Sequence, residues 1–208
     1  MDQSRKQRLS MLRSYTVADF FTLGNAACGT IAIFLCLNFI DEGRNRLFWI
    51  AFILIFVALA CDVVDGYWAR RSGRPSALGA DLDSLSDIIS FGVAPAVLGF
   101  TLGLRGAWDM LILVYFVVCG ISRLARFNVT ASALSDGTGK VKYFEGTPIP
   151  TSVFIVMLLG VAFSQDAIDR DLWLGAWRIG PGVLHPLTLI YAVSGSAMIS
   201  ASLRIPKP

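Results

Sequence analysis

Long apolar runs alternate with short polar segments along most of the chain. Six runs reach or approach the length that a helix needs to cross a membrane. They cover about residues 18–40, 47–69, 80–104, 107–127, 148–164 and 183–203. The fifth run is short and begins at Pro148 and Pro150. Because the polar segments between the runs are short, we predict one all-α integral membrane domain over residues 1–208, with six transmembrane helices in a single bundle.

Composition agrees with a membrane location. Hydrophobic residues make up 55% of the chain and charged residues 16%, whereas soluble domains are less apolar and more charged. Residues 1–16 are polar and basic, which predicts a short N-terminal interfacial helix and not a cleaved signal peptide. The net charge is only +3, so we expect the basic residues to meet anionic lipid and phosphate, with no nucleic acid as partner.

The basic residues predict the orientation of the bundle. Six spans place both termini on the same side, and thirteen of the 18 Lys and Arg residues then lie on that side. The positive-inside rule assigns this side to the cytoplasm. We therefore predict a multi-pass protein of the cell membrane with both termini, and the loop between the second and third spans, in the cytoplasm.

Cysteine and histidine usage excludes several kinds of chemistry. The four cysteines fall within the apolar runs and form no CxxC pair, so we expect neither a disulfide framework nor a zinc site. His185 is the single histidine and lies near the predicted outer end of the sixth run. One histidine cannot serve the phospholipase-D type of transfer, which needs two, and we assign His185 no catalytic role.

Aspartates gather around the predicted cytoplasmic loop between the second and third spans. At about 100° per residue, one helix face collects Asp62, Asp65, Gly66 and Ala69. The next helix carries a second stripe at four-residue intervals, formed by Gly79, Asp83 and Asp87. Asp81 points away from this stripe. Two helices joined by a short loop pack antiparallel, so we predict that the four stripe carboxylates converge.

Carboxylates at this depth need a compensating charge. Four like charges in an apolar setting repel each other, and intramembrane ionisable residues are functional by default. Divalent cations remove the conflict, since aspartate oxygens suit Mg²⁺, Mn²⁺ or Ca²⁺. Arg70 follows Gly66 by one turn and can pair with phosphate oxygens. The pattern indicates a site for a phosphate ester that approaches from the cytoplasm.

The full pattern is Asp62-x2-Asp65-Gly66-x2-Ala69-Arg70-x8-Gly79-x3-Asp83-x3-Asp87. It resembles, without a departure, the signature of the CDP-alcohol phosphotransferases. The resemblance implies a six-helix membrane fold, a homodimer, and transfer of a phosphatidyl or similar group from a CDP-linked donor to an alcohol, with release of CMP.

The same resemblance implies roles for the signature residues. The four aspartates hold divalent ions, Mg²⁺ or Mn²⁺, in a two-ion site. Gly66, Ala69 and Gly79 leave room for the cytidine nucleotide, Arg70 supports the phosphates, and Asp65 and Asp83 also belong to the nucleotide site. Asp87 is the expected general base.

Three further sequence segments bear on which alcohol is the acceptor. "TLGNAACGTIAIFL" (22–35), "CGISRLARFNV" (119–129) and "YFEGTPIPTS" (143–152) resemble the membrane-embedded CDP-diacylglycerol–serine O-phosphatidyltransferases of this family. L-Serine needs a cation for its carboxylate and an acceptor for its ammonium group. Arg123 and Arg126 suit the first, with Asn128 beside them, and Glu145 or a spare aspartate suits the second.

Alternatives stay open at this point. Arg123 and Arg126 also fit simple positive-inside anchors. Inositol phosphate, glycerol phosphate or choline could replace serine, and an archaeal ether lipid could replace diacylglycerol. A function of a different kind is that of a divalent-cation channel or carrier. The outer halves of the second and third runs, however, contain no polar path for an ion.

Overall fold

The computed structural model describes residues 16–72, 77–135, 143–200 and 204–206. Its helices are α2 (Val17–Glu42), α3 (Asn45–Ser72), α4 (Ala77–Asp87), π-helix η2 (Ile88–Val93), α5 (Ala94–Leu102), α6 (Ala107–Ser135), η3 (Ile149–Ser152), α7 (Val153–Ser164), η4 (Asp169–Asp171), η5 (Pro186–Thr188) and α8 (Leu189–Ile199). Its strands are β1 (Tyr143–Glu145), β2 (Trp177–Ile179), β3 (Gly182–Leu184) and β4 (Arg204–Pro206).

Helices α2 and α3 form an antiparallel hairpin with defined ends. Thr16 caps the start of α2: its hydroxyl accepts from the Asp19 backbone N–H, and the Asp19 carboxylate accepts from the Thr16 N–H at 2.6 Å. Gly43 ends α2 because it adopts a left-handed φ of +66°, which costs glycine little. The chain then turns back into α3 within two residues.

The third apolar run is continuous but not uniformly α-helical. It comprises α4, η2 and α5, and the Ala94 N–H bonds to the Ile89 carbonyl in the wider π register. Pro95 follows directly and has no N–H to donate. The third run therefore changes its helical register through a π-helical turn between Asp87 and Pro95. Such turns often occur at functional sites.

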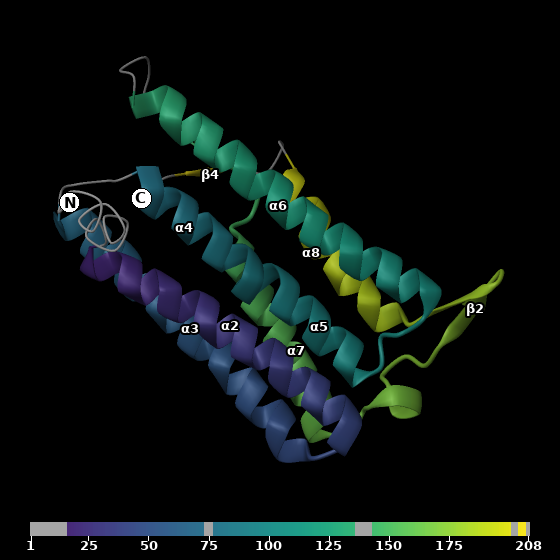
Figure 1. The fold of residues 1–208 in the computed structure, drawn as a ribbon. Helices are drawn as coiled ribbons and strands as arrows, with labels where there is room; N and C mark the ends of the chain where they lie inside the picture. The colour runs from purple at the N-terminus through teal and green to yellow at the C-terminus, as the bar shows by residue number, and fades with distance from the viewer. Residues whose placement is uncertain (1–15, 73–76, 136–142, 201–203, 207–208) are drawn as a thin grey trace, which may run out of the picture.

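This third run forms the centre of the bundle. Its most apolar window is 67% buried, compared with 22–28% for α2, α3 and α6. Helices α2 and α3 lie on one side of it and α6 on the other, with the successive helices running in alternating directions (Figure 1). Consequently, neighbouring helices shield the side chains near the C-terminal end of α4 from solvent and lipid.

Among the described residues, four helices are long and apolar enough to cross a membrane: Val17–Glu42, Asn45–Arg71, Leu78–Leu102 and Ala107–Val129. They make the chain a multi-pass membrane protein. The fifth and sixth runs form shorter apolar helices, Ile149–Ser164 and Pro186–Ile199. A count of six spans therefore stays a prediction, and the expected interfacial helix at residues 1–16 lies almost wholly outside the described residues.

The short helices pack closely on the long ones. The Tyr191 hydroxyl of α8 donates to the Pro95 carbonyl at 2.7 Å, which links α8 to the central run. A Cβ on Gly195 would come within 3.2 Å of the Phe116 Cα on α6. Gly195 thus allows α8 to pack closely on α6.

Two antiparallel strand pairs lie at opposite ends of the bundle. Strands β1 and β4 pair with Phe144 opposite Ile205, close to the start of α4. Strands β2 and β3 form a hairpin at the other end, beyond the start of α6 (Figure 1). The aspartate-rich ends of α3 and α4 lie toward the β1–β4 end.

Candidate functional site

Three aspartates from two helices meet beside the central run. Asp62 comes from α3, and Asp83 and Asp87 come from successive turns of α4. Each offers a carboxylate oxygen, and these three oxygens lie within 4.8 Å of one another. Asp87 is buried, and the other two are half-buried. The predicted meeting of the two acidic stripes thus brings together three carboxylates, called here the aspartate triad.

Asp65 does not join the triad. Its side chain is buried, and its Oδ2 accepts a hydrogen bond of 2.8 Å from the Thr22 hydroxyl of α2. The hydroxyl on α2 satisfies this carboxylate before any ligand is bound. Asp81 is exposed and lies outside the triad, as the helical spacing predicts.

Helix α2 supplies two donors that the sequence reasoning missed. Besides Thr22, Asn25 is fully buried, and its Nδ2 donates to Oδ1 of Asp87 at 3.2 Å. Thr22 and Asn25 are three residues apart, so they share a helix face. That spacing of polar residues inside an apolar run was the signal that could have found them.

A cavity of about 240 Å³ opens beside the triad, between α4, α6 and the segment before η3. It is lined by Asp83, Ser84, Asp87, Arg123, Leu124, Phe127, Gly146 and Pro148. Arg123 is the one basic side chain among these lining residues. Its Nε is buried and has no hydrogen-bond partner within the part of the chain that the structure describes. One wall of the cavity is therefore acidic, and another carries a guanidinium group with an unused donor.

The other predicted acceptor residues lie differently. Arg126 is exposed and does not line the cavity. The Asn128 amide ties α6 to α4, because its Oδ1 accepts from Ser84 Oγ at 3.1 Å and its Nδ2 donates to Asp81 at 3.4 Å. Glu145 pairs through its backbone with Arg204 in the β1–β4 ladder, and its side chain is outside the described part.

Pro148 lies at the start of the fifth run and precedes η3 in extended conformation. It also lines the cavity, next to Gly146. Gly146 has a left-handed φ of +76°, and a Cβ there would lie 2.1 Å from the Met198 carbonyl oxygen. Only glycine lets this segment turn so close to α8 and form the cavity wall.

Gly66 on α3 has room for a larger side chain among the described residues. A Cβ on Gly66 would meet only Nη1 of Arg70, at an ordinary contact distance of 3.5 Å. Packing within the described chain therefore does not demand glycine at this position. Ala69 and Arg70 are exposed, and Gly79 is half-buried on α4. Small residues here are consistent with room kept for a molecule outside the chain.

The triad fits a divalent cation. Carboxylate oxygens are the ligands that Mg²⁺, Mn²⁺ and Ca²⁺ prefer, at roughly 2.0–2.6 Å. Two oxygens that bind opposite sides of one such ion lie about 4–5 Å apart on that geometry. The 4.8 Å limit on the three triad oxygens is of this size.

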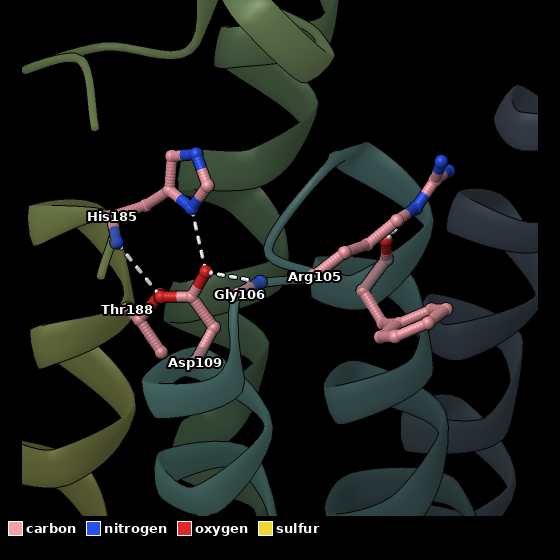
Figure 2. A network of polar contacts seen from close by, with 6 residues as sticks. Arg105, Gly106, Asp109, His185 and Thr188 are labelled. Atoms are coloured by element: carbon pink, nitrogen blue, oxygen red, sulfur yellow. Dashed lines mark hydrogen bonds and ion pairs between the residues drawn. The ribbon is translucent and has the colours of Figure 1, made fainter. Parts of the chain in front are cut away.

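A separate polar network lies at the start of α6 (Figure 2), and α6 begins at the end of the bundle opposite the start of α4 (Figure 1). Asp109 on α6 is fully buried and accepts from the Gly106 N–H at 2.9 Å, the His185 N–H at 2.8 Å and the Thr188 hydroxyl at 2.7 Å. Its Oδ2 also lies 2.5 Å from Nδ1 of His185. His185 thus anchors the segment before α8 to α6, away from the acidic cluster.

Residues 15–193 match the family model described as CDP-alcohol phosphatidyltransferase. The chain belongs to this family of transferases, whose members depend on divalent cations. Its aspartate triad is a group of carboxylates that could bind such an ion.

Individual members of this family are similar to the chain over much of its length. The chain is 39% identical over 208 residues to the CDP-diacylglycerol–serine O-phosphatidyltransferase of Saccharomyces cerevisiae, covering 99% of this chain and 75% of that protein. It is 34% identical over 148 residues to the protein of the same name from Methanocaldococcus jannaschii, covering 71% and 62%. It is 38% identical over 141 residues to the archaetidylserine synthase of Methanothermobacter thermautotrophicus, covering 66% and 54%.

Proposed function

We propose that this enzyme transfers the phosphatidyl group of CDP-diacylglycerol, or of an ether-lipid analogue, to the hydroxyl of L-serine and releases CMP. The observation that carries the proposal is the shared cavity of Asp83, Asp87 and Arg123. It combines cation-binding carboxylates with a guanidinium group within one small space. The names of the similar yeast and archaeal proteins support serine as the alcohol.

Serine matches the charges of this cavity. Its carboxylate would pair with Arg123, which has a buried donor to spare. Its ammonium group would meet a lining carboxylate such as Asp83, or Glu145 at the end of β1. Arg126 and Asn128 would act from the rim. A phosphorylated alcohol such as inositol phosphate brings more negative charge, and the described lining offers one basic residue for it.

The CDP-linked donor would bind along α3 and the start of α4. Gly66, Ala69 and Gly79 would leave room for the nucleotide, and Arg70 would contact its phosphates. Asp62, Asp65, Asp83 and Asp87 would hold Mg²⁺ or Mn²⁺, with two ions as the proposed number. A divalent cation bound there neutralises negative charge on the pyrophosphate.

Asp87 would act as the general base. It lies on the cavity wall and is buried, so a serine in the cavity can approach it without much competing water. The Asp87 carboxylate takes the proton of the serine hydroxyl. The serine oxygen forms a bond to the phosphorus that carries the diacylglycerol, and the bond from that phosphorus to the CMP oxygen breaks. CMP leaves with that electron pair.

Orientation and assembly belong to the same proposal. The basic surplus on the side of the termini supports a cytoplasmic active site. In a background with serine in place of the native cysteines, a cysteine at Asn45 should react with an impermeant reagent on intact cells. A cysteine at Lys142 should react only after permeabilisation. The homodimer that the family resemblance implies can be tested by crosslinking in native membranes.

An acceptor panel tests the function. The purified full-length chain is incubated with CDP-diacylglycerol, Mn²⁺ or Mg²⁺, and one of serine, inositol phosphate, glycerol phosphate or choline. Serine should give phosphatidylserine and CMP in equal amounts. Product from another alcohol and none from serine would replace the proposed acceptor.

A further inference from the structure

We infer that Thr22 and Asn25 of α2 are positioning residues that orient Asp65 and Asp87 and thereby set the affinity of the site for its divalent cation. This inference rests on the proposed cation site and extends it to a helix outside the acidic motif. It gives the first transmembrane helix a defined part in the chemistry.

The inward face of α2 changes character along its length. Its buried residues are Asp19, Thr22, Asn25, Gly29, Ala32, Cys36 and Phe39. The polar members occupy only the part that lies beside the acidic ends of α3 and α4, and the remainder is small or apolar. Thr22 and Asn25 are 3% and 0% exposed. Buried polar groups in an apolar helix are costly unless they are paired, so their partners matter.

Each of the two side chains donates to a different carboxylate. The Thr22 hydroxyl donates to Oδ2 of Asp65 at 2.8 Å, and the Asn25 amide donates to Oδ1 of Asp87 at 3.2 Å. A hydrogen bond to one oxygen restricts the rotation of the carboxylate and so narrows the directions in which its second oxygen can point. Hydrogen bonds of this kind to ligating carboxylates raise metal affinity by pre-orienting the ligand.

Backbone contact sets the position of Asn25. The Ser90 hydroxyl of η2 donates to the Asn25 carbonyl at 2.9 Å. One turn further along α2, a Cβ on Gly29 would lie 2.4 Å from Ser90 Oγ and 2.8 Å from its Cα. Only glycine permits this approach, so α2 and η2 are locked in one register. Because Asp87 immediately precedes η2, the same contact fixes Asn25 relative to Asp87.

A purely structural role makes a different prediction. If Thr22 and Asn25 only hold helices together, their loss lowers stability and leaves the cation requirement of the folded protein unchanged. If they orient the carboxylates, their loss weakens cation binding in protein that still folds. Direct Mn²⁺ binding separates the two, since it needs no acceptor and no turnover.

The test compares Thr22→Val, Thr22→Ser, Asn25→Leu and a control, Asn38→Leu, in the purified full-length chain. Thr22→Val removes the hydroxyl while keeping the branched shape, and Thr22→Ser keeps the hydroxyl. Asn38 is an exposed residue on the same helix. Free Mn²⁺ is measured by electron paramagnetic resonance, together with thermal unfolding, kcat, and KM for CDP-diacylglycerol.

We expect Asn25→Leu and Thr22→Val to weaken Mn²⁺ binding by about tenfold to a hundredfold. Their kcat should fall at sub-saturating Mn²⁺. Thr22→Ser and Asn38→Leu should match the wild type. Wild-type Mn²⁺ affinity in Thr22→Val, or equal affinity in Thr22→Val and Thr22→Ser, overturns the inference even if Asn25→Leu does not fold.

The outcome is independent of the acceptor. If the wild-type protein makes no phosphatidylserine but binds Mn²⁺ more tightly than Thr22→Val does, the proposed function is wrong and the inference about α2 still holds. If the wild-type protein makes phosphatidylserine and all variants bind Mn²⁺ equally, the inference about α2 is wrong and the proposed function still holds.

Discussion

Ser84 Oγ on α4 donates a hydrogen bond of 3.1 Å to Oδ1 of Asn128 on α6. The two residues are 44 positions apart and join the two helices that border the cavity. Ser84 lines the cavity, and Asn128 was expected from sequence to contact the acceptor. The hydrogen bond connects Asn128 to a wall of the cavity through Ser84.

Loss of this hydrogen bond should affect the acceptor more than the lipid donor. A single hydrogen bond contributes about 0.5–1.5 kcal/mol, so Ser84→Ala should raise KM for serine by roughly twofold to tenfold. KM for CDP-diacylglycerol should stay near the wild-type value. Initial rates over a serine series measure this, with the exposed Ser122→Ala on α6 as the matched control. Equal increases in both KM values would point to a general disturbance of α4.

Arg123 should matter more for serine than Arg126. Arg123 lines the cavity, and its buried Nε has no hydrogen-bond partner among the described residues, whereas Arg126 is exposed outside the cavity. A hydrogen bond to a charged group contributes about 1.5–3 kcal/mol, which corresponds to roughly a tenfold to hundredfold rise in serine KM for Arg123→Ala. Arg126→Ala should raise it by less. Steady-state kinetics of both variants show which substitution raises the serine KM more. A larger increase for Arg126→Ala would mean that serine binds at the rim of the cavity, near Arg126.

Asp87→Asn should abolish turnover and largely keep nucleotide binding. The amide is nearly isosteric with the carboxylate but cannot take the serine proton. Product formation should fall by at least about a hundredfold, the lower end of typical acid–base contributions. Binding of CDP is followed by isothermal titration calorimetry. Asp41→Asn, an exposed change at the other end of α2, is the control. Near-normal turnover in Asp87→Asn would remove Asp87 as the base.

Two glycines should respond oppositely to alanine. Gly66→Ala meets only Arg70 Nη1 at 3.5 Å, so the fold should tolerate it while the donor loses room, seen as a higher KM for CDP-diacylglycerol. Gly29→Ala meets Ser90 Oγ at 2.4 Å and should destabilise the fold by about 1–3 kcal/mol, as overpacking does. Thermal unfolding and kinetics of both variants separate the effects. A strongly destabilised Gly66→Ala would show that glycine serves packing there.

The Asp109 network should support stability and not chemistry. Asp109→Ala leaves the Gly106 N–H, the His185 N–H and the Thr188 hydroxyl without their acceptor. Each unsatisfied buried group costs about 1–3 kcal/mol, so the unfolding temperature should drop clearly. KM values of the remaining folded enzyme should be unchanged, because the network lies at the start of α6, at the end of the bundle opposite the start of α4 (Figure 1). The exposed Asp171→Asn is the control; a specific change in serine KM would contradict this role.

Much of the site can be predicted from the sequence alone, because it depends on helix geometry and on the short connection between two helices. Helical periodicity places Asp62 on one stripe and Asp83 and Asp87 on another, and a short connection makes the two helices antiparallel. It also sets Asp81 apart. These relations depend on 3.6 residues per turn and on chain connectivity, so no knowledge of other helices is needed to derive them. The apolar runs likewise predict the four long helices, because length and hydropathy are properties of each segment.

The partners of those aspartates were decided by the tertiary structure. Whether Asp65 joins the triad depends on where α2 places Thr22, and Asn25 reaches Asp87 from 62 residues away. Arg123 and Arg126 are equivalent in the sequence, yet only Arg123 lines the cavity, because the rotation of α6 against the central run selects one of them. Helix rotation and register come from side-chain packing between segments, at contacts such as Gly29 against Ser90. The sequence alone determined which residues could carry the chemistry, and the packing of α2 and α6 on the central helix decided which of them share a site.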